Sequence, residues 1–250
     1  MPLSPVAYLL VTHGSRDPRS PWMARQLAER VQHCLQASTA VPLWVETASL
    51  ELADVPLHQR IQQLGDRLCC HGGTVLQIVP LFLLPGVHVR DDIPAEVAIA
   101  QAHLPTLDVQ ICPYLGSHPH MGQLLQRSFD PRMGSRVLVS HGSRRAGGNA
   151  PIEAIAAQLG ALPAYWSVAP SLEQQVEQLV TTGTQAIAIL PYFLFAGGIT
   201  DAIAQQVHDL AQRHPTIQFS MAEPLGATAE VAHLVAQLSD RPAPDRYVSC

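Results

Sequence analysis

The sequence predicts an α/β protein built from two related halves, each a four-stranded parallel sheet flanked by helices. The first observation is a repeated motif: His13-Gly-Ser-Arg16 follows one short apolar run, and His141-Gly-Ser-Arg144 follows another. The second and third observations are short apolar runs and helix-start patterns that alternate along the chain. Two further landmarks keep the same order in both halves, pairing Pro80–Gly86 with Pro191–Gly197 and Leu115-Gly116 with Leu225-Gly226.

These shared landmarks predict an internal duplication, because ordered matches are a typical signature of repeated units. We expect an N-terminal domain over residues 1–131 that carries the functional site, a C-terminal repeat over residues 132–240 and a tail over residues 241–250. The 250 residues are enough for each half to bury a core of its own.

Eight short, nearly continuous apolar runs are the expected strands. Such runs are typical of parallel sheets whose two faces are both covered by helices. In chain order they are Tyr8–Thr12, Leu43–Ser49, Val75–Phe82, Val109–Pro113, Val137–Ser140, Ala164–Ala169, Ala186–Phe193 and Ile217–Met221.

The stretches between these runs contain helix-start signals. Ser20-Pro21 and Asn149-Ala-Pro151 each place a capping residue close to a proline of the first helical turn. The segment Ser171-Leu-Glu-Gln174 has the pattern of a capping box. Strands that alternate with helices favour right-handed crossovers within an open parallel sheet.

Composition excludes several classes of protein. All fifteen basic residues are arginine, so the chain has no lysine for a Walker A loop, a Schiff base or a protein kinase. The net charge of −5 argues against a nucleic-acid partner, because no basic stripe neutralises a row of phosphates. We therefore expect an enzyme or a small-molecule binder.

The chain start, the apolar stretches and the cysteines all favour a cytoplasmic protein. The apolar run that ends at Thr12 is too short for a signal peptide and lacks a basic flank. The most apolar stretch, Ile78–Val87, contains two prolines and is too short to cross a bilayer. Five cysteines without a C-x-x-C pair support neither a disulfide framework nor an iron–sulfur centre. We expect no membrane partner and no permanently bound cofactor.

Two histidines follow strands that should be neighbours in space. In open parallel sheets, ligands bind beyond the carboxyl ends of the strands, where the strand order reverses. For the order 2-1-3-4 this point lies between the first and third strands, which precede His13 and His88. Strands about 4.8 Å apart allow both imidazoles to reach one metal ion. The pair is the predicted metal site, although either histidine taken alone also fits an ordinary loop.

Glu51 follows the second strand and is the candidate acidic partner, although on its own it fits a helix-start carboxylate slightly better. His118 and His120 are spaced for weak metal binding but also suit a solvated loop, so we leave them outside the predicted site. The remaining histidines of the first and second halves are expected at the surface: His33, His58, His71, His103, His208, His214 and His233.

The second half retains only part of this arrangement. It keeps His141 but has Gly198 or Ile199 where the first half has His88, and Ser167–Pro170 contains no counterpart of Glu51. We therefore expect one functional site, in the first half, with the second half forming the opposite wall of a cleft.

At these residues the chain resembles the sirohydrochlorin chelatases in their long, two-domain form. The resemblance implies a lyase-type enzyme with two flavodoxin-like domains, which inserts Fe²⁺ or Co²⁺ into sirohydrochlorin for the biosynthesis of sirohaem or cobalamin. It places the metal-handling histidines at His13 and His88 and their acidic partner at Glu51. The matching segments are Leu9–Arg16, Ala48–Pro56, Val79–Pro94 and Leu115–Pro119.

The residue types suit the insertion of a metal into a tetrapyrrole, which removes two N–H protons. A neutral imidazole binds a divalent ion or accepts a proton near neutral pH, and a carboxylate relays protons. We expect His13 and His88 to deliver the metal ion and accept the protons, with help from Glu51. A polycarboxylate substrate also needs local positive charge and free amides. The expected substrate-binding residues are Gly14, Ser15, Arg16 and Arg90, with Arg144 or Arg145 on the opposing wall.

Two other functions remain open from the sequence. One is a metal or tetrapyrrole carrier with the same ligands but no turnover. The other is a phosphohydrolase that uses His13 as nucleophile, although Thr12 occupies the place of the arginine that precedes the histidine in histidine phosphatases. The donor types do not decide between Fe²⁺ and Co²⁺, but the absence of a metal-storing histidine tract favours Fe²⁺. A monomer and a homodimer both agree with two fused halves.

Overall fold

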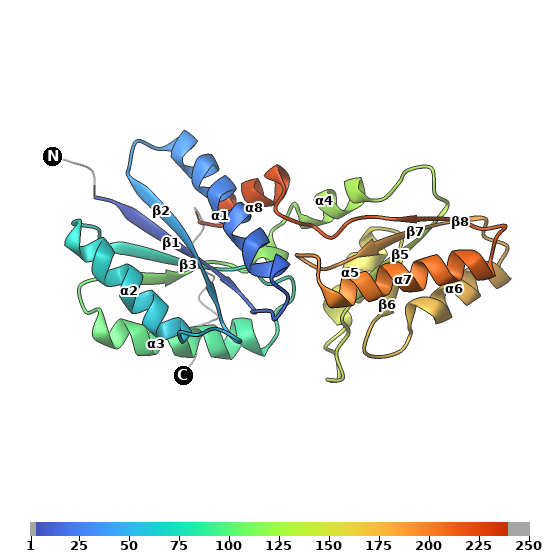
Figure 1. Ribbon diagram of the computed structural model, residues 1–250, viewed down its shortest axis with the longest axis horizontal. Helices are drawn as coiled ribbons and strands as arrows, with labels where there is room; N and C mark the ends of the chain where they lie inside the picture. The colour runs from blue at the N-terminus through green and yellow to red at the C-terminus, as the bar shows by residue number, and fades with distance from the viewer. Residues whose placement is uncertain (1–3, 240–250) are drawn as a thin grey trace. The chain divides into compact units, whose positions relative to one another are not determined.

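The strands form two separate four-stranded sheets in the computed structural model, which describes residues 4–239 (Figure 1). The predicted tail over residues 241–250 lies outside the described residues. The described residues divide into two units: the first unit comprises residues 4–118 and 227–239, and the second unit comprises Pro119–Gly226. Every pair of neighbouring strands is parallel, so the predicted α/β class is confirmed.

The sheet of the first unit has the strand order β2-β1-β3-β4, with the reversal between β1 and β3 that the sequence predicts. Its elements, in chain order, are β1 (Val6–Thr12), α1 (Arg19–Ser38), β2 (Leu43–Ser49), α2 (Leu57–Cys70), β3 (Val75–Pro80), a π-helical turn (His88–Asp92), α3 (Ile93–His103), β4 (Asp108–Ile111), a 3₁₀ turn (Leu115–Ser117) and α8 (Ala229–Ser239).

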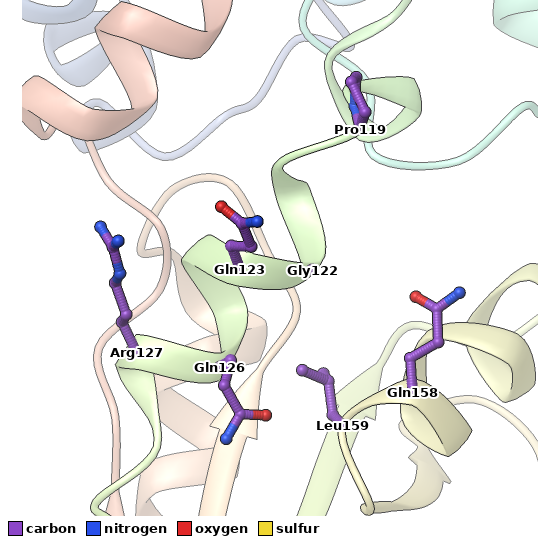
Figure 2. A pocket seen from close by; sticks show the side chains of 7 residues that line it. All are labelled: Pro119, Gly122, Gln123, Gln126, Arg127, Gln158 and Leu159. Carbon is purple, nitrogen blue, oxygen red and sulfur yellow. The ribbon is translucent and has the colours of Figure 1, made fainter.

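The second unit repeats this order as β6-β5-β7-β8. Helix α4 lies beside the end of α5, and Figure 2 shows the shallow depression between these two helices. The elements of the unit are α4 (Met121–Ser128), β5 (Ser135–Ser140), α5 (Ala150–Gln158), β6 (Leu162–Tyr165), α6 (Leu172–Thr181), β7 (Ala186–Pro191), α7 (Gly198–Arg213) and β8 (Gln218–Met221).

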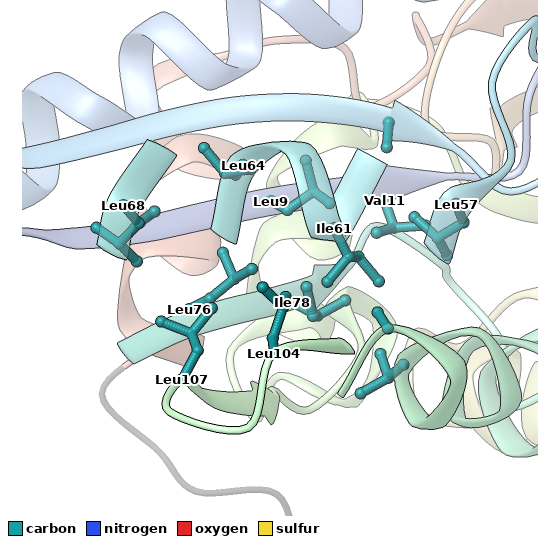
Figure 3. Packing of buried hydrophobic residues seen from close by; sticks show 14 of the residues in the cluster. Leu9, Val11, Leu57, Ile61, Leu64, Leu68, Leu76, Ile78, Leu104 and Leu107 are labelled. Atoms are coloured by element: carbon teal, nitrogen blue, oxygen red, sulfur yellow. The ribbon is translucent and has the colours of Figure 1, made fainter. Parts of the chain in front are cut away.

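Helix spacing explains how one face of the first sheet is covered. Helix α2 carries apolar residues three or four positions apart, a pattern that makes one apolar stripe: Leu57, Ile61, Leu64 and Leu68. Figure 3 shows this stripe packed over the inward side chains of β1 and β3, together with Leu104 and Leu107 after α3. All of these side chains are almost fully buried. A rigid sheet of this kind holds the ends of β1, β2 and β3 in fixed positions.

Helices that follow the fourth strand of each half do not stay with that half. Helix α8, at the end of the second repeat, packs against α1 within the first unit, whereas α4, at the end of the first repeat, belongs to the second unit. Each of these two helices therefore packs within the unit that is formed by the strands of the other repeat. We keep the boundary between residues 131 and 132 as a proposal about the sequence repeat.

The predicted start of one helix and the predicted bounds of one strand are wrong. Helix α1 begins at Arg19 after Pro18, not after a Ser20 cap, because the Asp17 carboxylate already accepts a hydrogen bond from the Arg19 amide. Strand β6 covers Leu162–Tyr165 rather than Ala164–Ala169, because the backbone beyond Tyr165 turns to the end of β5. The other predicted strands lie within two residues of the observed ones at each end.

The helix starts of the second unit follow the predicted pattern more closely. Ser171 caps α6 through a capping box in which its hydroxyl accepts from the Gln174 amide and the Gln174 side chain accepts from the Ser171 amide. Asn149 stands at the N-cap of α5, but its side-chain oxygen accepts from the Ser143 amide instead of capping the helix. Among the residues described, no helix combines the length and apolar character that a bilayer-spanning segment needs.

Candidate metal centre

The imidazoles of His13 and His88 lie side by side at the carboxyl edge of the first sheet. His13 follows β1 directly, and His88 begins the π-helical turn that comes after β3. Because β1 and β3 are hydrogen-bonded neighbours, their loops emerge next to one another. The two rings meet edge to face with their centroids 4.7 Å apart.

Glu51 joins this pair from the end of β2. Its amide donates a hydrogen bond of 2.9 Å to the His13 carbonyl oxygen. Its Oε2 atom lies 3.7 Å from His13 Nε2. One ligand atom from each of His13, Glu51 and His88 lies within 4.8 Å of the other two. The structure thus brings together all three residues that the sequence singled out.

The geometry suits a divalent ion with open coordination positions. Donor atoms about 2.1 Å from a common ion are up to about 4 Å apart, so small side-chain rotations bring the three atoms to coordination distance. The side chains of His13 and Glu51 are about half exposed, at 52% and 51%, and that of His88 is 30% exposed. Two nitrogens and one carboxylate on an exposed edge leave room for further ligands. Among residues 4–239, this is the one group of three or more such side chains close enough to share an ion.

Gly14 allows the close packing between the first two of these loops. It has a φ of +104°, and a Cβ atom there would lie 2.0 Å from the Glu51 carbonyl oxygen. A glycine is therefore required both for the backbone angle and for the contact. Gly14, which the sequence assigns to substrate binding, has a clear structural task in positioning Glu51 beside His13.

The other predicted substrate-binding residues differ in the contacts that they make. The Ser15 hydroxyl accepts a hydrogen bond from the Asp17 amide. Arg16 and Arg90 are exposed and form no ion pair within the part of the chain that is described. Both guanidinium groups are consequently available to an anionic ligand.

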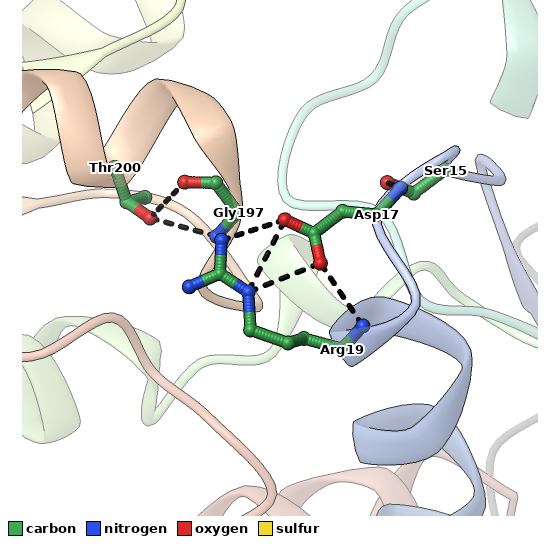
Figure 4. A network of polar contacts seen from close by, with 5 residues as sticks. All are labelled: Ser15, Asp17, Arg19, Gly197 and Thr200. Atoms are coloured by element: carbon green, nitrogen blue, oxygen red, sulfur yellow. Dashed lines mark hydrogen bonds and ion pairs between the residues drawn. The ribbon is translucent and has the colours of Figure 1, made fainter.

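The start of α1 holds a carboxylate of the chain itself. Asp17 occupies it: its carboxylate accepts from the Arg19 amide and pairs with the Arg19 guanidinium at 2.6 Å (Figure 4). These hydrogen bonds from Arg19 lower the pKa of Asp17 from 3.8 to about 2. The first amide of the helix is thus paired with an internal carboxylate. Figure 4 also shows the start of α7, where the Gly197 amide donates to the Thr200 hydroxyl.

Asp92 and Phe82 are neighbours of the cluster that sequence reasoning missed. Asp92 Oδ2 lies 2.7 Å from His88 Nδ1. The Phe82 ring centroid lies 5.9 Å from that of His88 and 6.4 Å from that of His13. The spacing of four residues between His88 and Asp92 is the signal that could have found the carboxylate, because such residues meet on one face of a helix.

Gly116 is a further residue whose role only the structure reveals. A Cβ atom at Gly116 would lie 1.9 Å from the Leu83 carbonyl oxygen, and the Gly116 amide donates to the Phe82 carbonyl oxygen. The repeated Leu115-Gly116 landmark therefore holds the loop that leads to His88.

Three of the histidines outside the cluster are less exposed than the sequence predicts. His118 is only 2% exposed instead of lying in a solvated loop, whereas His120 is exposed as expected. Of the seven histidines expected at the surface, two are half-buried and pair with carboxylates: His58 with Glu96 and His214 with Glu177. The other five are exposed.

The second unit keeps the backbone of the site but not its ligands. The Ser167 amide donates to the His141 carbonyl oxygen at 2.9 Å, as the Glu51 amide does to His13. Ser167 therefore occupies the position of Glu51, and the helix start at Gly198 and Ile199 replaces His88. The depression in Figure 2 contains one guanidinium and three amide side chains, and no His, Cys or carboxylate side chain to hold a divalent ion.

Comparisons with known proteins agree with these observations. The sirohydrochlorin cobaltochelatase of Priestia megaterium is 26% identical over 231 residues, which cover 86% of this chain and 72% of that protein. The sirohydrochlorin ferrochelatase of Priestia megaterium is 27% identical over 244 residues, covering 92% of this chain and 88% of that protein. The structure of SirB from Bacillus subtilis with Fe³⁺ has the same fold, with a TM-score of 0.76 and 23% identity over 96% of both chains.

The duplication is also visible in the family comparison. The family model described as CbiX matches the chain twice, over residues 7–131 and 135–241. These two matches cover nearly all of the chain, and the resemblance to sirohydrochlorin chelatases that the motifs suggested is confirmed. Because this family model matches both halves, the chain belongs to the CbiX family.

Proposed function

We propose that this protein is a sirohydrochlorin chelatase, which inserts a divalent metal ion into sirohydrochlorin and releases two pyrrole N–H protons. The observation that carries the proposal is the cluster of His13, Glu51 and His88, whose ligand atoms lie within 4.8 Å of one another on an open sheet edge. Relatives bear the names of both cobaltochelatases and ferrochelatases. We favour Fe²⁺ as the metal substrate, with Co²⁺ as the alternative.

The metal ion is a substrate that passes through the cluster. The two imidazole nitrogens and the Glu51 carboxylate are donors that accept both Fe²⁺ and Co²⁺. Exposure of the cluster leaves the remaining positions of the ion to water, which the pyrrole nitrogens displace. The protein needs no resident cofactor for this exchange, because metal insertion involves no net oxidation or reduction.

The same side chains accept the protons that metal insertion releases. An imidazole nitrogen that does not hold a metal ion has a lone pair that can accept a proton. As the metal ion leaves His13 and His88 for the macrocycle, their nitrogens become free to accept the two protons. Glu51, 3.7 Å from His13 Nε2 and half exposed, passes a proton onward to water.

Arg16 and Arg90 bind the carboxylates of the tetrapyrrole in this proposal. Both are exposed and unpaired within the described part of the first unit, and a guanidinium is well suited to hold a carboxylate through two hydrogen bonds. Asp17 does not neutralise them, because it pairs with Arg19. The proposal holds for a monomer and for a homodimer, since the metal cluster lies within one unit of one chain.

The direct test is an anaerobic absorbance assay with sirohydrochlorin and either Fe²⁺ or Co²⁺. We expect conversion of the tetrapyrrole spectrum over many turnovers, with loss of activity in the His13→Ala/His88→Ala double variant. The His33→Ala variant is the matched control, because His33 is exposed on α1 outside the cluster. Stoichiometric binding without turnover would instead identify a carrier, and the absence of binding would reject the tetrapyrrole as ligand.

A further inference from the structure

The pairing of His88 with Asp92 is the closest polar contact made by any side chain of the cluster. Asp92 Oδ2 lies 2.7 Å from His88 Nδ1, and both residues belong to the π-helical turn after β3. Since a carboxylate accepts hydrogen bonds, Nδ1 carries the hydrogen in this pair. The other ring nitrogen, Nε2, is then the atom with a lone pair for a metal ion.

The helical turn that holds this pair contains one residue more than its counterpart in the second unit. Val89 and Ile93 are buried in the first unit, and Thr200 and Ile203 are buried at the same place in α7. Three residues separate the first pair, whereas two separate the second. The Ile93 amide donates to the His88 carbonyl oxygen, which closes the wider turn of a π-helix.

The extra residue changes which side chain lies above His88. In the regular helix α7 the buried Ile203 lies four positions after Ile199. In the π-turn the extra residue puts Asp92 four positions after His88, where both side chains share one face of the helix, and Ile93 one place later. Asp92 is thereby placed over His88 while Ile93 remains in the core. In the second unit the histidine, the carboxylate partner and the extra residue are all absent: Ile199 takes the place of His88, and α7 is a regular α-helix from Gly198.

The first histidine of each half, unlike His88, contacts a backbone carbonyl oxygen instead of a carboxylate. His13 Nδ1 lies 3.3 Å from the Gly14 carbonyl oxygen, and His141 Nδ1 lies 3.1 Å from the Gly142 carbonyl oxygen. This contact is a property of the repeated loop, because it occurs in both halves. The contact between His88 and a carboxylate occurs only where the second histidine and Glu51 are also present.

We propose that Asp92 is a positioning residue, which fixes the orientation and tautomer of His88 so that Nε2 faces His13 and Glu51. The proposal rests on the proposed function, since it assigns His88 to the metal-handling site. A carboxylate behind a metal-binding histidine restricts the rotation of the ring and fixes which ring nitrogen carries the hydrogen. The π-turn then accommodates Asp92 beside His88 while Ile93 remains buried in the core.

The test measures Co²⁺ binding to the metal-free protein, through titration and the visible spectrum of the bound ion. Loss of such a partner typically weakens metal binding about 10- to 100-fold, and we expect this of Asp92→Ala, together with an altered Co²⁺ spectrum. Asp92→Asn retains an oxygen that accepts from Nδ1, so it should restore most of the affinity and the wild-type spectrum. Asp91→Asn removes the same charge from the exposed neighbouring residue and should bind Co²⁺ as the wild type does.

A purely structural role for Asp92 would change the thermal unfolding temperature but not the spectrum of bound Co²⁺. The proposal is overturned if Asp92→Ala binds Co²⁺ with wild-type affinity and spectrum, or if the wild type binds no Co²⁺. If Asp92→Ala fails to fold, Asp92→Ser replaces it, because its shorter side chain leaves His88 Nδ1 without this partner. Weaker Co²⁺ binding by Asp92→Ser than by Asp91→Asn then supports the positioning role, and equal binding by the two variants overturns it. Failure of metal insertion with intact, Asp92-dependent Co²⁺ binding would reject the proposed function and leave this inference standing.

Discussion

The carbonyl oxygen of His13 accepts a hydrogen bond of 2.9 Å from the amide of Glu51, while the Glu51 carboxylate lies 3.7 Å from His13 Nε2. A backbone contact and a side-chain contact therefore join the same two residues. The backbone contact sets the spacing of the two loops, and this spacing in turn determines the distance between the two side chains. Changes to the loop should consequently affect metal binding even where no ligand is removed.

Gly14→Ala tests this dependence. The new Cβ would lie 2.0 Å from the Glu51 carbonyl oxygen and would require a φ of +104°, so we expect a loss of about 2 kcal/mol or more of folding stability. Co²⁺ binding should weaken as well, because Glu51 must move. Urea unfolding and Co²⁺ titration measure both effects. Gly134→Ala is the control, since nothing lies within 4 Å of its Cβ position; equal behaviour of the two variants would contradict the proposed role.

Single substitutions of the cluster should separate catalysis from folding. We expect His13→Ala, His88→Ala and Glu51→Gln each to lower kcat for metal insertion by about 100-fold or more, as is usual for groups that transfer protons. The unfolding free energies of His13→Ala and Glu51→Gln should stay within about 0.5 kcal/mol of wild type, because half-exposed side chains at the surface contribute little. Wild-type turnover by any one of these variants would remove that residue from the site.

Arg16→Ala and Arg90→Ala test carboxylate recognition. Each loss of a guanidinium contact should raise the KM for sirohydrochlorin about tenfold, equivalent to about 1.4 kcal/mol, with a small change in kcat. The increase should shrink at high salt, since ions screen exposed charges. Arg25→Ala, on the exposed side of α1, serves as the comparison. A KM equal to that of the wild type would exclude the arginine concerned.

Leu52 follows Glu51 with a φ of +54°, an unfavourable backbone angle for a bulky residue. Its side chain is 58% exposed, so shortening it removes little packing. We expect Leu52→Gly to be about 1 kcal/mol more stable than Leu52→Ala, because glycine relieves the strain and alanine does not. Urea unfolding of the two variants provides the measurement, and equal stabilities would show that the angle carries no strain.

Local patterns in the sequence are sufficient to predict most of the fold and the centre of the site. Apolar runs identify the strands, because a strand buried on both faces is apolar along its whole length. The repeated His-Gly-Ser-Arg motif identifies the two halves, and the ends of β1 and β3 bring His13 and His88 together once the strand order is 2-1-3-4. Each of these inferences depends on residues close together in the chain or on a general rule of sheet topology.

Tertiary structure alone decided the features that depend on contacts between distant segments or on the exact path of the backbone. Packing assigns α8 to the first unit, and burial removes His118 from the solvent. The Asp17 carboxylate, which competes for the start of α1, moves the helix start to Arg19. One extra residue in a helical turn places Asp92 over His88. Sequence periodicity records which face of an element is buried, but it does not record which partner covers that face or where a turn widens by one residue.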